Sequence, residues 1–406
     1  MQFALSFLEG YRHYLKRHVG SLAIAAGVGA AGASGLYYLY QSTRGEDWAL
    51  SSSQQGLYGS AAARQSAQAE ADENLASHFI SVQSISDSTT LPQMLEELER
   101  HLNRAASLDA LILQLRQLRG PAEQIAPLKH ALWRELAESG FARLAATIWL
   151  LPLLQLLLRV QLNILGRQLF VESNLLEPRG RPGSWKAVRL STQADQLVRV
   201  GKGAQEQFLE YAHYLPERSV QAAVDRQKLA GFAVLESTEL AQDMSAEQVH
   251  SLLEEMSSEF EEAVQLGGGW TELALPSEEE AQRYFASFRR APPDNSALVP
   301  GTQIAITDEE IVKALVAELV QVMSSAPFAA ALKASVDVTL KAVHDVLRAE
   351  LGEQRLPLAK MVPRVSHIGD ALLKPDGSIR QPVLESIAAL PEVRDLAASV
   401  YSFGPA

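Results

Sequence analysis

The chain has 406 residues, of which 47% are hydrophobic, and a formal charge of -12 at pH 7. This acidic balance, with no long Lys/Arg cluster, argues against a nucleic-acid partner and against broad adhesion to an anionic membrane surface. The chain contains no cysteine, which excludes disulfides and thiolate metal sites.

The first predicted element is a membrane anchor over residues 19–43. This uncharged run follows a basic segment, residues 1–18, that contains Arg12, Lys16 and Arg17. As a helix the run rises by about 37 Å, which exceeds the roughly 30 Å of a bilayer core. We therefore interpret it as a single transmembrane helix. A cleaved signal peptide or a buried core helix would have to explain both its length and its tyrosine-rich end.

Charge alone leaves the orientation of this anchor open. Three basic residues precede it, whereas Arg44 after it is offset by Glu46 and Asp47. The positive-inside rule would then keep the N-terminus in the cytosol and place the large domain in the lumen. A basic patch beside an apolar run can instead serve as a targeting signal that a receptor reads.

The rest of the chain is predicted to be a flexible linker over residues 44–75 and an all-α domain over residues 76–406. The linker is rich in Ser, Gln, Ala and Gly, which bury little. After it, Pro92 suits the first turn of a helix, and extended alternation of polar and apolar residues is hard to find. Apolar residues recur at helical spacing over 94–102, 108–118, 249–260, 311–322 and 332–351. Gly and Pro predict breaks at 177–184, 267–269 and 291–301.

A second apolar run, residues 144–158, is predicted to be a core helix rather than a second membrane span. Its fifteen residues rise by only about 22 Å. Continuing the helix places a polar stripe on its surface, which consists of Gln155, Arg159, Asn163 and Arg167. Arginine is costly in hydrocarbon, so burial within a bundle explains the stripe better than lipid does.

Catalytic and metal-binding patterns are absent from the sequence. The nine histidines are scattered, with no H-E-x-x-H pattern and no clustered partners. Gly201, Lys202 and Gly203 lack the spacing of a phosphate-binding loop and are interpreted as a turn. We therefore predict a protein that is not an enzyme and that needs no cofactor or metal.

Several motifs resemble the peroxin-3 family of peroxisomal membrane biogenesis factors. Residues 157–166 read LLRVQLNILG and resemble the family signature. Residues 356–363, LPLAKMVP, and 393–401, VRDLAASVY, resemble its late elements in the same order. Residues 14–18 before the apolar run are similar to the family's targeting and anchor region, and 78–79 to the start of its soluble domain. The resemblance extends along the whole chain.

The resemblance implies a docking receptor in the peroxisomal membrane. Family members have one anchor and a large all-α domain that faces the cytosol, in contrast to the orientation that charge alone suggests. That domain binds peroxin-19, the chaperone that delivers newly made peroxisomal membrane proteins. The partner lays an amphipathic helix into an apolar groove, so the cargo reaches the bilayer indirectly through peroxin-19.

The resemblance also implies which residues form the groove. Counting back without a gap from the signature places the family's groove Lys and Trp on Lys129 and Trp133, and a groove leucine on Leu136. Periodicity agrees, because Leu128, Leu132 and Leu136 form one row that can face the core, while Lys129 and Trp133 lie nearer its border. Without the family, Trp133 would be interpreted as an ordinary core aromatic. The further groove residues are assigned to Leu118 and Ile125.

Two other function classes remain as alternatives at this stage. One is a membrane-anchored helical tether that recruits cytoskeletal or organelle-inheritance factors, and the other is a membrane-anchored hydrolase. A tether would use surfaces away from residues 122–140. A hydrolase would need a pocket with converging polar groups.

Overall fold

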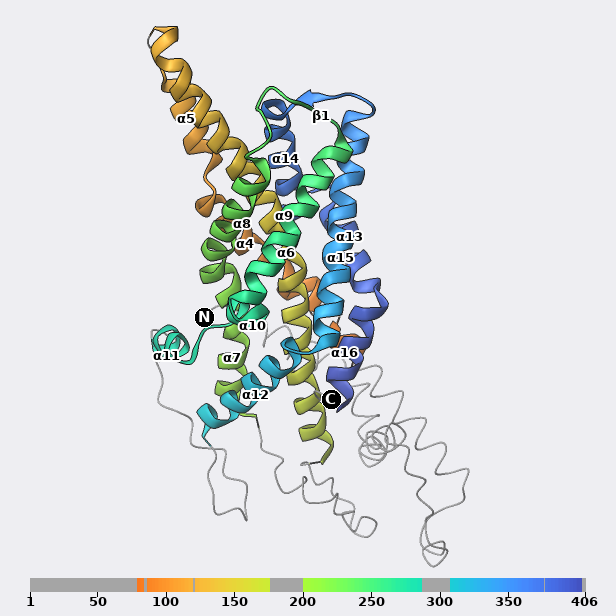
Figure 1. The fold of residues 1–406 in the computed structure, drawn as a ribbon. Coiled ribbons are helices and arrows are strands. Elements are labelled where there is room, and N and C mark those ends of the chain that lie inside the picture. The colour runs from red at the N-terminus through yellow and green to blue at the C-terminus, as the bar shows by residue number, and fades with distance from the viewer. Residues whose placement is uncertain are drawn as a thin grey trace, which may run out of the picture.

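The computed structural model describes residues 79–83, 86–119, 121–175, 200–286, 307–375 and 377–403. The predicted basic segment, transmembrane anchor and linker, residues 1–75, lie outside the described residues. So do the predicted breaks at 177–184 and 291–301. The described residues form an elongated all-α bundle, which confirms the predicted fold class (Figure 1).

Helices account for nearly all of the described elements. Those of the first half are η3 (Ser86–Thr90), α4 (Leu91–Ala105), α5 (Leu108–Gln117), α6 (Ala122–Leu175), α7 (Lys202–Glu210), η5 (Tyr211–His213), η6 (Leu215–Ser219) and α8 (Val220–Leu235). Those of the second half are α9 (Ala246–Leu266), α10 (Gly269–Ala274), α11 (Glu278–Ala286), α12 (Asp308–Met323), α13 (Ala326–Leu351), α14 (Leu358–Leu373), α15 (Arg380–Ala389) and α16 (Pro391–Phe403). Two short strands, β1 (Asp243–Met244) and β2 (Leu356–Pro357), pair antiparallel, with Asp243 opposite Pro357.

The long helix α6 forms the axis of the bundle, and the other helices pack around its middle and C-terminal parts (Figure 1). Among the described residues, Glu123–Leu169 is a helix long and apolar enough to cross a membrane, but its most apolar window is completely buried in the protein. The bent pair α12 and α13 passes the same test only when the two are joined across a 63° bend. The prediction that residues 144–158 form a core helix is therefore confirmed.

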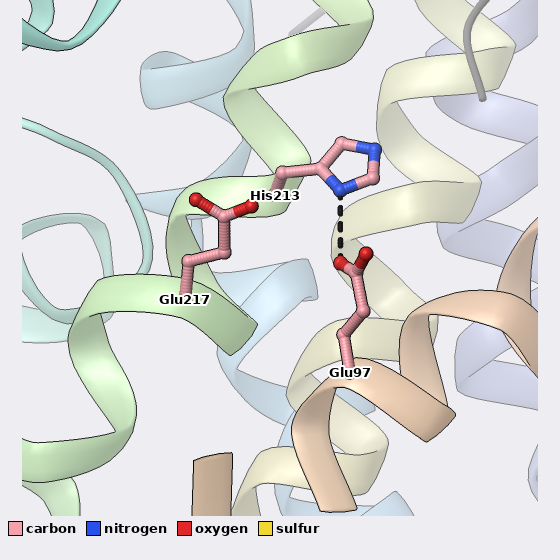
Figure 2. Close-up of side chains that lie close together, drawn as sticks. All are labelled: Glu97, His213 and Glu217. Carbon is pink, nitrogen blue, oxygen red and sulfur yellow. Dashed lines mark hydrogen bonds and ion pairs between the residues drawn. The ribbon is translucent and has the colours of Figure 1, made fainter. Parts of the chain in front are cut away.

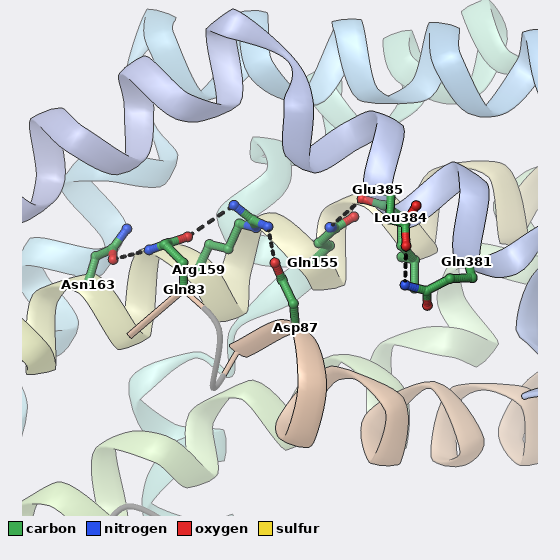
Figure 3. Close-up of polar contacts among 8 residues, drawn as sticks. All are labelled: Gln83, Asp87, Gln155, Arg159, Asn163, Gln381, Leu384 and Glu385. Atoms are coloured by element: carbon green, nitrogen blue, oxygen red, sulfur yellow. Dashed lines mark hydrogen bonds and ion pairs between the residues drawn. The ribbon is translucent and has the colours of Figure 1, made fainter. Parts of the chain in front are cut away.

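The predicted polar stripe of α6 joins this helix to its neighbours through specific hydrogen bonds. Gln155 donates to the Leu384 carbonyl oxygen of α15 at 3.1 Å, and Arg159 forms an ion pair with Asp87 of η3 (Figure 3). Asn163 donates to the Ala397 carbonyl oxygen of α16 at 3.3 Å. Burying these groups is acceptable because each finds a partner at a fixed position. The stripe therefore sets the rotation of α6 within an otherwise apolar core.

The segments that carry the family resemblance are packing elements. In the signature, Gln161 donates to the Phe208 carbonyl oxygen, and Gly166 lies against Val82. In the C-terminal element, Tyr401 contacts the ring of Phe79 edge to face, with the ring centroids 5.2 Å apart. These contacts fasten residues 79–83, where the described chain begins, to the C-terminal halves of α6 and α16.

One predicted break is confirmed and one predicted turn is wrong. Gly267 and Gly268 separate α9 from α10, and Gly268 and Gly269 have φ of 99° and 84°, a left-handed conformation that favours glycine. By contrast, Lys202 and Gly203 begin helix α7 instead of forming a turn. The glycine there serves close packing, since a Cβ on Gly203 would lie 2.7 Å from a carboxylate oxygen of Asp308.

Candidate docking surface

Helix α5 and the first turns of α6 form a hairpin that projects from one end of the bundle (Figure 1). Helix α5 ends at Leu118, whose backbone N–H bonds the Gln114 carbonyl oxygen, and Pro121 begins the next helix by accepting bonds from Gln124 and Ile125. Pro127 interrupts the hydrogen bonding of α6 within its first two turns. The side chains described between residues 116 and 131 are all exposed or half-buried, so the hairpin has few neighbours near its tip.

The structure brings all six predicted groove residues onto this hairpin. Leu118 and Ile125 are half-buried near the tip, and Lys129 is exposed. Leu132 and Trp133 are half-buried, whereas Leu136, only 3% exposed, lies at the base. Trp133 is thus partly exposed, as its place near the border of the row predicts, and it also packs against apolar neighbours. That these residues bind a partner stays a prediction.

An apolar cluster at the base of the hairpin supports Trp133. We call this the base cluster; it consists of Leu108, Leu111, Leu136, Ala137 and Val362. Leu132 and Trp133 pack against it, together with Ile112, Leu115 and Leu240. Val362 belongs to the LPLAKMVP segment and comes from α14. The family motif thus helps to support the hairpin from below. Leu118 and Ile125 do not belong to this cluster.

The hairpin also presents apolar side chains to solvent. Leu113 of α5 is 55% exposed and Leu128 of α6 is 57% exposed. The expectation that Leu128, Leu132 and Leu136 form one row facing the core is therefore wrong for Leu128. The bundle ends below this residue, so helical spacing alone gives it nothing to pack against. Large exposed apolar residues on the same hairpin as a half-buried tryptophan are typical of interaction sites.

Arg134, which the sequence analysis did not single out, braces the hairpin against the bundle. Its guanidinium donates to the carbonyl oxygens of Leu235 at 2.9 Å, Thr238 at 2.8 Å and Glu236 at 3.2 Å. These carbonyls lie at and beyond the C-terminal end of α8, where a cation is favourable. The partners lie about a hundred positions away in sequence, so no local pattern indicates this role.

The charge of the hairpin differs from that of the whole chain. Residues 108–136 contain four Lys or Arg and three Asp or Glu, a formal charge of +1, whereas the chain carries -12. Glu138 lies one turn after Arg134 on α6. Burial raises the pKa of Glu138, and the charge of Arg134 opposes this shift. The apolar surface is therefore not surrounded by the acidic excess found elsewhere, which suits an apolar or acidic partner helix.

Comparisons with known proteins place the chain in a family. The Peroxin-3 family profile matches residues 120–403, about two thirds of the chain. The chain belongs to the peroxin-3 family. Peroxisome biogenesis protein 3-2 of Arabidopsis thaliana is 24% identical over 327 residues, which cover 78% of this chain and 80% of that protein. Peroxisome biogenesis protein 3-1 of the same plant is 26% identical over 166 residues, which cover 40% of this chain and 42% of that protein.

Membership of this family confirms the resemblance seen in the sequence motifs. It assigns the chain a role in peroxisome biogenesis, and the family is one of biogenesis factors rather than of enzymes. The profile match begins at residue 120, so it includes the α6 half of the hairpin with Lys129 and Trp133.

Proposed function

We propose that this peroxin-3 family member is the docking receptor for peroxin-19 in the peroxisomal membrane. Residues 19–43 anchor it as a single span, the basic segment with Arg12, Lys16 and Arg17 serves as the targeting signal, and the all-α domain faces the cytosol. The proposal rests chiefly on one observation. A half-buried tryptophan, Trp133, lies among exposed and half-buried leucines on a hairpin that projects from the bundle.

The chemistry of the hairpin suits an amphipathic helix as ligand. Such a helix would place its apolar face on Trp133, Leu132 and the exposed Leu128, while Lys129 contacts its polar border. Aromatic side chains at the centre of an interface commonly contribute most of its binding energy. Because the base cluster already holds Trp133 on one side, binding would not have to order this side chain from a free state.

The position of the hairpin suits capture of cargo from the cytosol. The described chain begins with residues 79–83, of which Phe79 contacts Tyr401 and Gln83 donates to Asn163. Along α6, Trp133 lies thirty residues from Asn163, a rise of about 45 Å. An anchor over residues 19–43 would therefore be joined through the predicted linker to one end of the bundle, with the docking hairpin at the other end.

Replacing Trp133 by alanine tests the proposal. We expect protein lacking residues 1–43 to bind the N-terminal helix of peroxin-19, and Trp133→Ala to weaken that binding by about 2 kcal/mol or more, since an interface aromatic is lost. Isothermal titration calorimetry measures the affinity. Leu266→Ala is the matched control, because Leu266 is 83% exposed at the end of α9 and lies outside the hairpin.

Wild-type affinity in Trp133→Ala would remove this residue from the site. Wild-type protein that fails to bind peroxin-19 would overturn the docking role itself. The tether alternative predicts a different result, in which pull-down of cytoskeletal or inheritance factors depends on surfaces outside residues 122–140. Exposed Leu229 and Phe232 on α8 are the positions to substitute in that experiment.

A further inference from the structure

Three potential metal ligands from three separate elements meet on the side of the bundle. They are Glu97 of α4, His213 of η5 and Glu217 of η6, and Figure 2 shows their side chains converging. One ligand atom from each lies within 4.8 Å of the others, and all three residues are half-buried. His213 Nδ1 lies 3.1 Å from Glu97 Oε2. The group is thus compact, yet not sealed from solvent.

A fourth side chain orients one of these ligands. The Tyr284 hydroxyl of α11 donates to Glu217 Oε2 at 3.0 Å, and its ring meets Tyr214 edge to face. Ligands of metal sites are commonly held by such an outer hydrogen bond, which leaves the other carboxylate oxygen available.

The electrostatics of the group favour a cation. Three carboxylates, those of Glu97, Glu210 and Glu217, act on His213. A protonated His213 can neutralise only one of these three carboxylates. Arg100 and His101, on the same helix as Glu97, act on the Glu97 carboxylate.

We propose that Glu97, His213 and Glu217 form a binding site for one zinc ion. Imidazole nitrogen together with carboxylate oxygens suits zinc better than calcium or magnesium, which prefer oxygen alone. Tetrahedral zinc at about 2.0 Å from each ligand separates ligand atoms by about 3.3 Å. His213 and Glu97 already have nearly this spacing, and a carboxylate oxygen of Glu217 lies within 4.8 Å of both ligand atoms. Water would complete the coordination.

The site would connect two supports of the projecting hairpin. Helix α4 leads through residues 106–107 directly into α5, and η6 leads directly into α8. The C-terminal end of α8 is held by Arg134 of the hairpin. An ion shared by α4, η5 and η6 would therefore fasten both elements to each other. The inference does not depend on what the hairpin binds.

Zinc binding to the full-length protein, purified in detergent with any tag removed and stripped with chelator, tests the site. Equilibrium dialysis is expected to find one tightly bound zinc per wild-type chain, and Co²⁺ in its place is expected to give the visible absorption of a four-coordinate ion. Glu217→Gln, which keeps the side-chain shape, should weaken binding by about tenfold or more. His213→Gln should abolish the absorption band.

A matched control separates this site from nonspecific binding. His250 and Glu254 of α9 form a histidine–carboxylate pair at 3.3 Å, one turn apart on a single helix. Glu254→Gln should therefore leave zinc binding unchanged. Circular dichroism checks that each variant is folded. The proposal is overturned if wild-type protein binds no zinc at one per chain, or if the bound zinc survives both Glu217→Gln and His213→Gln.

Discussion

His213 and Glu97 form a contact whose strength depends on the protonation of both residues. The hydrogen bond to His213 is the main cause of the lowered pKa of Glu97. Burial lowers the pKa of His213, but the same bond and nearby carboxylates raise it, and the net shift is upward. Two groups with opposite shifts stabilise the fold together only where both are charged. Their ordinary pKa values, 4.5 and 6.5, bound the pH range in which this stabilisation is complete.

The pH dependence of unfolding tests this contact in chelator, without metal. A raised folded pKa gives stability that is complete below pH 6.5 and is lost as pH rises through the folded value. A lowered carboxyl pKa gives stability that is complete above pH 4.5 and is lost on acidification. We therefore expect His213→Gln to destabilise the protein more at about pH 5.5 than at about pH 8.5, as measured by urea unfolding.

The exposed His367 of α14 supplies the control, because His367→Gln removes a histidine without removing a described ion pair. The groups that face His213 are Glu97, Glu210 and Glu217, and none of them is changed in either variant. Equal destabilisation of His213→Gln at both pH values would contradict the ionic interpretation of this contact.

Two glycines within helices, which the sequence alone does not distinguish, differ in how closely a neighbouring side chain packs against them. Gly166 of α6 and Gly369 of α14 both lie inside helices, where alanine is usually preferred by about 1 kcal/mol. A Cβ on Gly166, however, would lie 2.8 Å from Val82, whereas one on Gly369 would make an ordinary contact of 3.8 Å with Leu144. Close packing therefore requires a glycine at position 166 but not at position 369.

Alanine at the two positions should have opposite effects. Gly166→Ala forces Val82 away and is expected to destabilise the protein by about 1–3 kcal/mol, as overpacking does. Gly369→Ala is expected to be neutral or to stabilise it by up to about 1 kcal/mol. Urea unfolding measures both, and limited proteolysis should show residues 79–83 released only in Gly166→Ala. A stable Gly166→Ala variant would mean that Val82 adapts without cost.

At the scale of the whole molecule, the hairpin and the start of the described chain lie at opposite ends of one helix. Helix α6 connects them, and ion pairs hold it along its length: Arg143 bonds Asp370 of α14, and Arg167 bonds Glu318 of α12 at 2.6 Å. Arg134 is the corresponding contact nearest the hairpin. A rigid axis of this kind would keep the proposed docking surface at a constant distance from residues 79–83, where the described chain begins.

Removing Arg134 should loosen the hairpin without touching the proposed ligand-binding face. Arg134→Ala removes the guanidinium donor from the carbonyl oxygens of Leu235, Glu236 and Thr238, of which Leu235 keeps a bond from the Thr238 backbone N–H, at a cost of about 1–3 kcal/mol. We expect faster hydrogen exchange over residues 108–136 and weaker peroxin-19 binding, because an ordered hairpin binds more tightly. Arg283→Ala, whose ion pair with Glu279 is exposed, is the control. Unchanged hydrogen exchange over residues 108–136 would show that the base cluster alone holds the hairpin in place.

Local sequence pattern predicted a large part of the fold. Helical periodicity identified α4, α5, α9, α12 and α13, because each buries an apolar face that repeats every three to four residues. The spacing of Gln155, Arg159 and Asn163 likewise separated a core helix from a membrane span. The motifs at 157–166, 356–363 and 393–401 identified the family, and they prove to be packing elements.

The sequence by itself determined the all-α class, the buried axis and the helix that carries Trp133, since these depend on residues a few positions apart. Only the tertiary structure decided that Leu128 is exposed, that Arg134 braces α8, and that Glu97 meets His213 and Glu217. Those contacts join residues separated by about a hundred positions or depend on where the bundle ends. Periodicity within one helix specifies which face turns inward, but not which neighbour covers it or where that cover stops.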